Sequence, residues 1–100
     1  MMKIPKKFKI ANNWINVEIV DSLPNSNYGD YNDAKQVIRI AKTVSIDDEV
    51  VNLTEEQLFN TWWHEYVHAM QFYYDNNTSE SQAQVFANFL CELFATKFNI

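Results

Sequence analysis

Both histidines of the chain lie in one short segment, NTWWHEYVHAMQ, which covers residues 60–71. In a helix, His64 and His68 lie one turn apart on the same face, where their imidazoles can bind a single metal ion. Glu65 lies about 100° around the helix from His64, beside the ligand face. Its apolar surroundings raise the pKa of a carboxyl group and suit it to act as a general base. The spacing predicts metal-assisted acid–base chemistry.

The histidine pair also has an explanation without a metal. An amphipathic helix presents a polar stripe to solvent, and histidines on it usually have no further role. The polar stripe here consists of Gln57, Asn60, Thr61, His64, His68, Gln71 and Asp75. His-Glu-x-x-His, however, arises by chance in about a few of every thousand chains of this length. This rarity, and the apolar helix around the pair, favour metal ligands.

A catalytic zinc site usually has three protein ligands, so the two histidines require a third. The chain has no other histidine, and its single cysteine, Cys91, is remote. Asp75 lies about 10 Å along the helix axis from His68, which is too far for the same ion. Glu92 lies about 120° from the inward stripe of the next helix. These positions leave Glu80, although the helix dipole alone also favours an acidic residue in a first turn.

Glu80 begins a second predicted helix, and small residues follow it on the same face. The residues of that face are Ala83, Ala87, Cys91, Phe94 and Phe98. The alanines allow the two helices to approach closely, which brings the Glu80 carboxylate to the histidines. We therefore predict a metal site of His64, His68 and Glu80.

The first part of the chain, residues 7–41, is predicted to form the strands of a sheet. The stretch KFKIANNWINVEIVD predicts two strands, because apolar and polar residues alternate in its second half and Asn12-Asn13 is a plausible turn. The stretch YGDYNDAKQVIRIA predicts a second hairpin, with strands over residues 28–31 and 36–41 and a turn over residues 32–35. The stretch KTVSIDDEVVN is ambiguous and is interpreted as a connection.

Two helices follow the strands. Thr54 and Gln57 form a capping box that begins the first, over residues 54–75. The segment DNNTS ends it, and Ser79 with Gln82 can cap a second helix over residues 79–98. Strands before helices predict one α+β domain of residues 1–100, in which an antiparallel or mixed sheet of three or four strands packs against both helices.

Composition excludes several classes of protein. The formal net charge is -5, and residues 10–100 carry four basic and thirteen acidic side chains, which argues against nucleic acid as a partner. No run approaches the roughly 18 apolar residues of a membrane span, and the first residues lack the apolar region of a secretory signal. The single cysteine fits a cytoplasmic location. The 15% aromatic content is high enough for some rings to form a subunit contact in a homo-oligomer.

The segments HEYVHA and ESQAQVFA resemble the gluzincins, zinc peptidases with two helical histidines and a glutamate from the next helix. They are similar to the ImmA/IrrE-type pattern HExxH followed by E-x-E-A-N-x-F-A, which Glu80, Ala83, Phe86 and Ala87 match. The hairpin YGDYNDAKQVIRI is also similar to strands of minigluzincins and of small phage-borne and mobile-element metallopeptidases. The resemblance covers roughly residues 14–98, and only the two metal segments are specific.

This resemblance implies a minimal zincin-like domain with metalloendopeptidase activity and one zinc ion per chain. It implies that His64, His68 and Glu80 bind the ion, that Glu65 activates water, and that an extended protein or peptide substrate lies against a sheet edge near Tyr28 to Tyr31. The residue that stabilises the oxyanion stays open among Tyr28, Tyr31, Tyr73 and Tyr74.

The chain departs from the family pattern at two positions. Gln82 and Gln84 replace the Glu and Asn of the ImmA/IrrE pattern, and Gln84 stands where thermolysin-like enzymes have an aspartate that contacts a ligand histidine. Support for the ligand histidines is therefore expected to be weaker, or to come from other residues.

Two other hypotheses of function compete with that of an enzyme. One is a non-catalytic or latent zinc-stabilised module that binds proteins through the same sheet edge. The other is a metal-free helical interaction protein, which leaves the coincidence of His64, His68 and Glu80 unexplained. Glu65 distinguishes the zinc-stabilised module from a peptidase, because a purely structural zinc site does not need this carboxylate.

Overall fold

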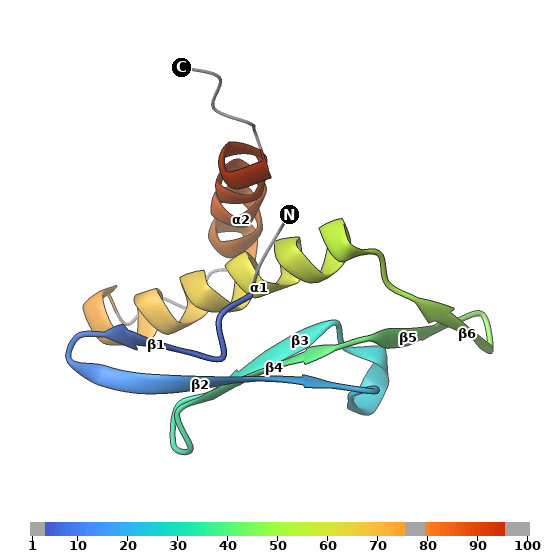
Figure 1. Cartoon of the computed structure of the whole chain (residues 1–100), viewed down its shortest axis with the longest axis horizontal. Coiled ribbons are helices and arrows are strands. Elements are labelled where there is room, and N and C mark those ends of the chain that lie inside the picture. Colours follow the sequence, from blue (N-terminus) through green and yellow to red (C-terminus); the bar gives the residue numbers. More distant parts are fainter. Residues whose placement is uncertain (1–3, 76–79, 96–100) are drawn as a thin grey trace.

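The computed structural model describes residues 4–75 and 80–95, which form two sheets and two long helices (Figure 1). The strands are β1 (Lys7–Ile10), β2 (Asn13–Val20), β3 (Gly29–Asn32), β4 (Val37–Ala41), β5 (Thr43–Ile46) and β6 (Glu49–Asn52). The helices are α1 (Glu55–Met70) and α2 (Glu80–Ala95), with a short 3-10 helix at Pro24–Ser26 and a π-helical turn at Gln71–Asp75.

The larger sheet is mixed and has the strand order β1-β2-β4-β3. β1 pairs with β2 and β3 pairs with β4 in antiparallel hairpins, whereas β2 and β4 run parallel. The predicted α+β class, with a small sheet before two helices, is confirmed. β3 lies at an edge of the sheet, and this is the strand that the sequence predicted at residues 28–31.

Several strand boundaries differ from the prediction by one residue, including those of β3, which covers Gly29–Asn32 where residues 28–31 were predicted. The turn between β1 and β2 lies at Ala11 and Asn12, whose φ angles are 48° and 66°, and Asn13 already pairs with Ile10. A two-residue turn with positive φ at both positions matches the twist of the flanking strands, so the turn is one residue earlier than predicted. Gln36 has a φ of 53° and precedes β4, so it does not belong to the strand.

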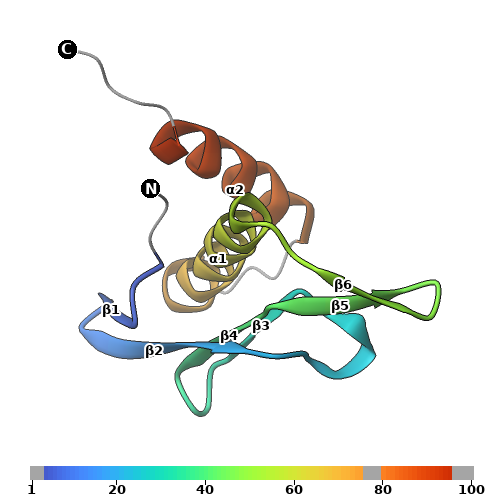
Figure 2. The same ribbon diagram turned by 45° about the vertical axis from the view of Figure 1, so that its right-hand side comes forward.

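The stretch that the sequence left as a connection is a third hairpin, β5–β6. Asp47 and Asp48 have φ angles of 51° and 64°, and Ile46 pairs with Glu49 across them. Aspartate tolerates this left-handed conformation, which two-residue hairpin turns require. Val44 is buried, but all four residues of β6 are exposed. Figure 2 shows this hairpin projecting beyond the main sheet, with both helices on one side of that sheet.

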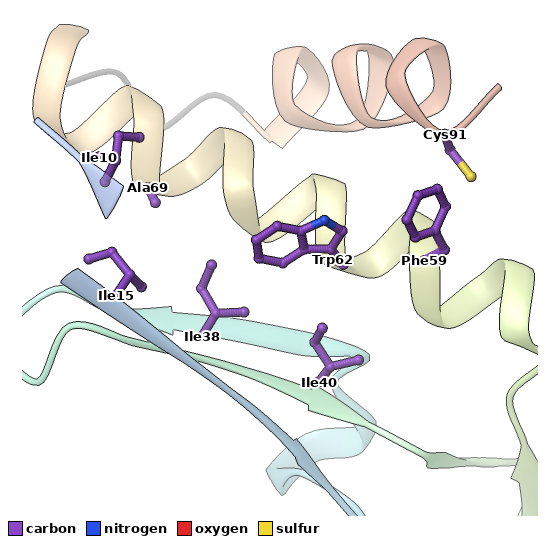
Figure 3. Packing of buried hydrophobic residues seen from close by; sticks show 8 residues of the cluster. All are labelled: Ile10, Ile15, Ile38, Ile40, Phe59, Trp62, Ala69 and Cys91. Carbon is purple, nitrogen blue, oxygen red and sulfur yellow. The ribbon is translucent and has the colours of Figure 1, made fainter. Parts of the chain in front are cut away.

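The core lies between the main sheet and α1 (Figure 3). Ile38 and Ile40 point from the sheet toward Trp62 and Phe59 of the helix, and all four are at most 5% exposed. Each such buried side chain contributes about 1.5–3 kcal/mol relative to an exposed one. This packing fixes which face of α1 turns away from the sheet.

Local sequence sets the limits of α1. Thr54 accepts a hydrogen bond from the Gln57 backbone, and the Gln57 side chain accepts one from the Thr54 backbone, so the predicted capping box is present. The last turn, predicted as ordinary helix, is π-helical from Gln71 onward. The proposed cap at Ser79 and the end of the second helix beyond Ala95 lie outside the described residues.

α2 packs on α1 through the predicted face. Ala83 and Ala87 are fully buried and Cys91 is 5% exposed, which confirms that small residues allow close helix packing. The opposite face of α2 is also apolar and open to solvent, with Val85, Phe89 and Leu93 each about half exposed or more. The expected subunit contact through aromatic side chains stays a prediction.

Candidate metal centre and cleft

Three residues with possible ligand atoms lie close together where α1 faces the first turn of α2. Nε2 of His64 and Nε2 of His68 are 3.1 Å apart. The Glu80 carboxylate reaches both rings, with Oε2 at 3.2 Å from His64 Nε2 and Oε1 at 2.7 Å from His68 Nε2. The possible ligand atoms of these residues all lie within 4.8 Å of one another, so the group is close enough to bind one metal ion.

The geometry and chemistry of this group fit zinc. Zinc binds imidazole nitrogen and carboxylate oxygen at about 2.0–2.2 Å, so two ligand atoms of one tetrahedral ion lie roughly 3.3–3.6 Å apart. The separations of 3.1 Å between the two histidine nitrogens and 3.2 Å between His64 and Glu80 Oε2 lie just below that range, and Glu80 Oε1 lies at a hydrogen-bond distance of 2.7 Å from His68. Two imidazole nitrogens this close beside a carboxylate also require a proton or a metal cation between them.

One competing carboxylate, Glu92, does not join the group. Glu92 is exposed on α2, and among the described residues it is not part of the His64, His68 and Glu80 cluster. The side chain of Asp75 lies outside the described part of the structure. The structure thus brings together the three residues that the sequence predicted as ligands.

Glu65 is buried beside the three donors. Only 6% of it is exposed, and burial is the largest cause that raises its pKa to about 8, followed by the charges of Glu80 and Asp30. A cation bound at the donor group acts in the opposite direction, because it favours the charged carboxylate. Glu65 lines the same cleft as the three donors.

The only glycine of the chain brings β3 against this part of α1. A Cβ atom on Gly29 would lie 2.7 Å from Cγ2 of Thr61, 3.0 Å from the Arg39 backbone oxygen and 3.1 Å from Cγ of Glu65. A larger residue would push β3 away from the helix. Gly29 therefore places the edge strand directly beside the buried carboxylate.

A cleft of about 1110 Å³ runs between β3, α1 and the first turn of α2. His64, His68, Glu80 and Glu65 line it together with Tyr28 and Tyr31. Volumes in this range are typical of ligand-binding clefts. The metal-binding group is thus open to a molecule that approaches along β3.

The two tyrosines predicted near the substrate differ in their surroundings. Tyr28 is 44% exposed at the cleft. Tyr31 packs partly against the core, and burial and the neighbouring Tyr73 raise its pKa. Tyr73 packs on the core and accepts a hydrogen bond from Gln36, and it is not among the residues that line the cleft. The side chain of Tyr74 lies outside the described residues, so Tyr28 and Tyr31 are the oxyanion candidates that reach the cleft.

Two glutamines that the sequence analysis did not assign contact the ligand histidines. Gln84 Oε1 is 2.9 Å from Nδ1 of His64, and Gln71 Oε1 is 3.0 Å from Nδ1 of His68. The helical spacing of His68 and Gln71 could have indicated the second contact. The first is a contact between helices, and its signal in the sequence was the position of Gln84 in the family pattern, where a residue that contacts a ligand histidine is expected.

Comparisons with protein families, with curated proteins and with solved structures found no match. The site must therefore be interpreted from its own geometry. Within residues 4–75 and 80–95, neither helix has the length and apolar character needed to span a membrane.

Proposed function

We propose that the protein is a zinc-dependent metallopeptidase that hydrolyses a protein or peptide substrate. The observation that carries this proposal is the convergence of His64, His68 and Glu80 beside the buried Glu65, all lining one cleft. Burying a carboxyl group costs free energy, and a zinc site that only stabilises a fold gains nothing from it. Glu65 therefore favours an enzyme over a zinc-stabilised binding module.

In the proposed reaction, each residue of the site has a separate role. Zinc held by the three ligands supplies Lewis acidity for the scissile carbonyl and for the attacking water. Glu65 accepts a proton from that water as its oxygen bonds to the carbonyl carbon. It then gives the proton to the amide nitrogen as the carbon–nitrogen bond breaks. Of the two cleft tyrosines, Tyr28 has the exposed side chain that is available to donate a hydrogen bond to the carbonyl oxygen, because the Tyr31 hydroxyl is buried.

The edge of β3 supports an extended substrate. The backbone of Ala41 donates to the Tyr28 carbonyl at 2.8 Å, and the antiparallel register continues with Gly29 opposite Ile40. Bonding alternates along such a pair, so Gly29 and Tyr31 turn their backbone groups away from β4. A peptide strand can pair with these groups in the cleft, as in other cases of strand addition.

The charge of the cleft supports a basic peptide. Its acidic lining residues are Asp30, Asp33, Glu56, Glu65 and Glu80, and no lysine or arginine lines it in the described part of the chain. Arg39 pairs with Asp30, and a bound zinc ion offsets charge at the centre. Glu56 and Asp33 remain as exposed acidic groups that attract lysine or arginine side chains.

Cleavage of denatured casein by wild type and by Glu65→Gln, both loaded with zinc, tests the proposal. The substitution keeps the shape of the side chain but removes the proton acceptor. We expect the variant to retain zinc and to lose about two to four orders of magnitude in rate.

Equal rates in the two proteins would show that Glu65 is not the base. If wild type with one zinc per chain cleaved neither casein nor lysine-rich peptides, the binding module would replace the enzyme as the better account.

A further inference from the structure

The two ligand histidines are oriented by neutral amides. Nδ1 of His64 contacts Gln84 Oε1 at 2.9 Å, and Nδ1 of His68 contacts Gln71 Oε1 at 3.0 Å. An amide oxygen can only accept a hydrogen bond, so each Nδ1 must carry the hydrogen. In a neutral imidazole this leaves the lone pair on Nε2, which is the atom directed at the metal-binding group.

The Gln84 amide is held in this orientation by two asparagines. Its Nε2 donates to Asn60 Oδ1 at 3.2 Å and to Asn88 Oδ1 at 2.8 Å, and Asn60 donates to the same Asn88 oxygen at 3.1 Å. Turning the amide over would place its oxygen against two other oxygens. The asparagines therefore keep Oε1 on His64.

The Gln71 amide is held in a similar way. Its Nε2 donates to Gln82 Oε1 at 2.7 Å, and its side chain is only 2% exposed. Gln71 is also the first residue of the π-helical turn. Such turns often occur at functional sites, and this one begins at the residue that contacts His68.

We propose that Gln84 and Gln71 are positioning residues, which hold His64 and His68 with the hydrogen on Nδ1 and set the zinc affinity of the site through uncharged hydrogen-bond acceptors. This inference rests on the proposed zinc site. A carboxylate in the same place makes an imidazole a stronger ligand, because it favours positive charge on the ring. An amide fixes the ring without that effect.

Gln84 provides the test, because it is exposed and can be replaced without opening the core. Gln84→Leu removes the acceptor at similar volume, and we expect zinc affinity to fall about 10- to 100-fold. Gln84→Glu keeps the acceptor on His64 but places its second oxygen beside the Asn60 and Asn88 oxygens, and we expect zinc affinity above that of Gln84→Leu. Val85→Ala changes the adjacent residue, which lies on the open face of α2, and should leave the affinity unchanged. Competition with a chromophoric chelator measures all four proteins.

A second measurement needs neither zinc nor activity. Nitrogen-15 NMR of the metal-free protein shows which ring nitrogens carry hydrogen. We expect Nδ1 of both histidines to carry it in wild type and Gln84→Glu, although free histidine prefers the hydrogen on Nε2. In Gln84→Leu, His64 should lose this preference while His68 keeps it.

The two measurements separate the inference from the proposed function. Hydrogen on Nδ1 without zinc binding would uphold the amide network and overturn the metallopeptidase. Zinc binding that Gln84→Leu leaves unchanged would overturn the positioning role alone. Metal-free wild type in which Nδ1 of either histidine carries no hydrogen would also overturn it.

Discussion

The fold holds the two histidines and Glu80 in different ways. The His64 and His68 side chains project from the middle of α1, are 16% and 15% exposed, and have a second contact on each ring. Glu80 is the first residue of α2, and its side chain is 76% exposed. The two ligands on α1 are therefore mostly buried, whereas the third is exposed and lies on α2, whose docking also supplies the Gln84 contact to His64.

This difference makes α2 the part of the site that metal binding should affect most. α2 docks on α1 through small buried side chains, including Ala83 and Ala87. A zinc ion bound by residues of both helices adds a link at the end of α2 where Glu80 lies. Four predictions follow the comparison from the strongest expected effect to the weakest.

Removal of Glu80 should abolish most zinc binding, because two histidines do not complete a catalytic zinc site. We expect Glu80→Ala to lose most of its zinc affinity in chelator competition. Asp75→Ala and Glu92→Ala should bind like wild type. A variant of Glu92 that loses zinc while Glu80→Ala retains it would show that the facing of α2 is wrong.

Removal of zinc should destabilise the protein, because the ion binds only the folded chain. At a free zinc concentration of 100 times Kd, the stabilisation is about 2.7 kcal/mol. Urea unfolding with zinc and with a chelator measures it, and His64→Ala serves as the control without a site. Hydrogen exchange should show more added protection in α2 than in α1. Equal gains in protection would contradict the contrast between the mostly buried histidine ligands of α1 and the exposed ligand of α2.

Substitution of Gly29 tests the close approach of β3 to α1. We expect Gly29→Ala to lower the free energy of unfolding by about 1–3 kcal/mol, because the new methyl group meets Thr61 and Glu65. Ser45→Ala, on an exposed position of β5, is the control. Urea midpoints that match those of wild type would mean that β3 does not lie against Glu65.

Removal of an exposed acidic side chain that lines the cleft should have the weakest effect of the four changes. Glu56 lines the cleft and the adjacent Glu55 does not, yet both are exposed in the first turn of α1. We expect Glu56→Gln to lower kcat/KM for a lysine-containing peptide by less than tenfold, since exposed charge pairs contribute about 0.2–1 kcal/mol. Glu55→Gln should change it less. Identical losses would assign the effect to helix stability instead of substrate contact.

The fold was predictable where one local pattern dominates. Alternation of Ile15 and Val17 with polar residues predicts β2, and the capping box at Thr54 predicts the start of α1. The β5–β6 hairpin was not predicted, because β6 is exposed on every residue and gives no alternation. Its one signal was Asp47-Asp48 between two runs of β-branched residues.

The candidate ligands were predictable because helical periodicity places them. The spacing of His64 and His68 and the small residues after Glu80 each specify a helix face. Gln84 and Gln71 could not be assigned in this way, since uncharged amides are common on exposed helices and their hydrogen bonds depend on how α2 crosses α1. Gly29 was a missed signal, because an isolated glycine in a strand often marks a close backbone approach.

The central claim is that His64, His68 and Glu80 bind one zinc ion. Elemental analysis of the purified protein after dialysis without chelator tests it most directly. We expect about one zinc per chain, because three ligands and a water complete one tetrahedral site. A ratio near zero that added zinc does not restore would contradict the metal site and the peptidase proposed from it.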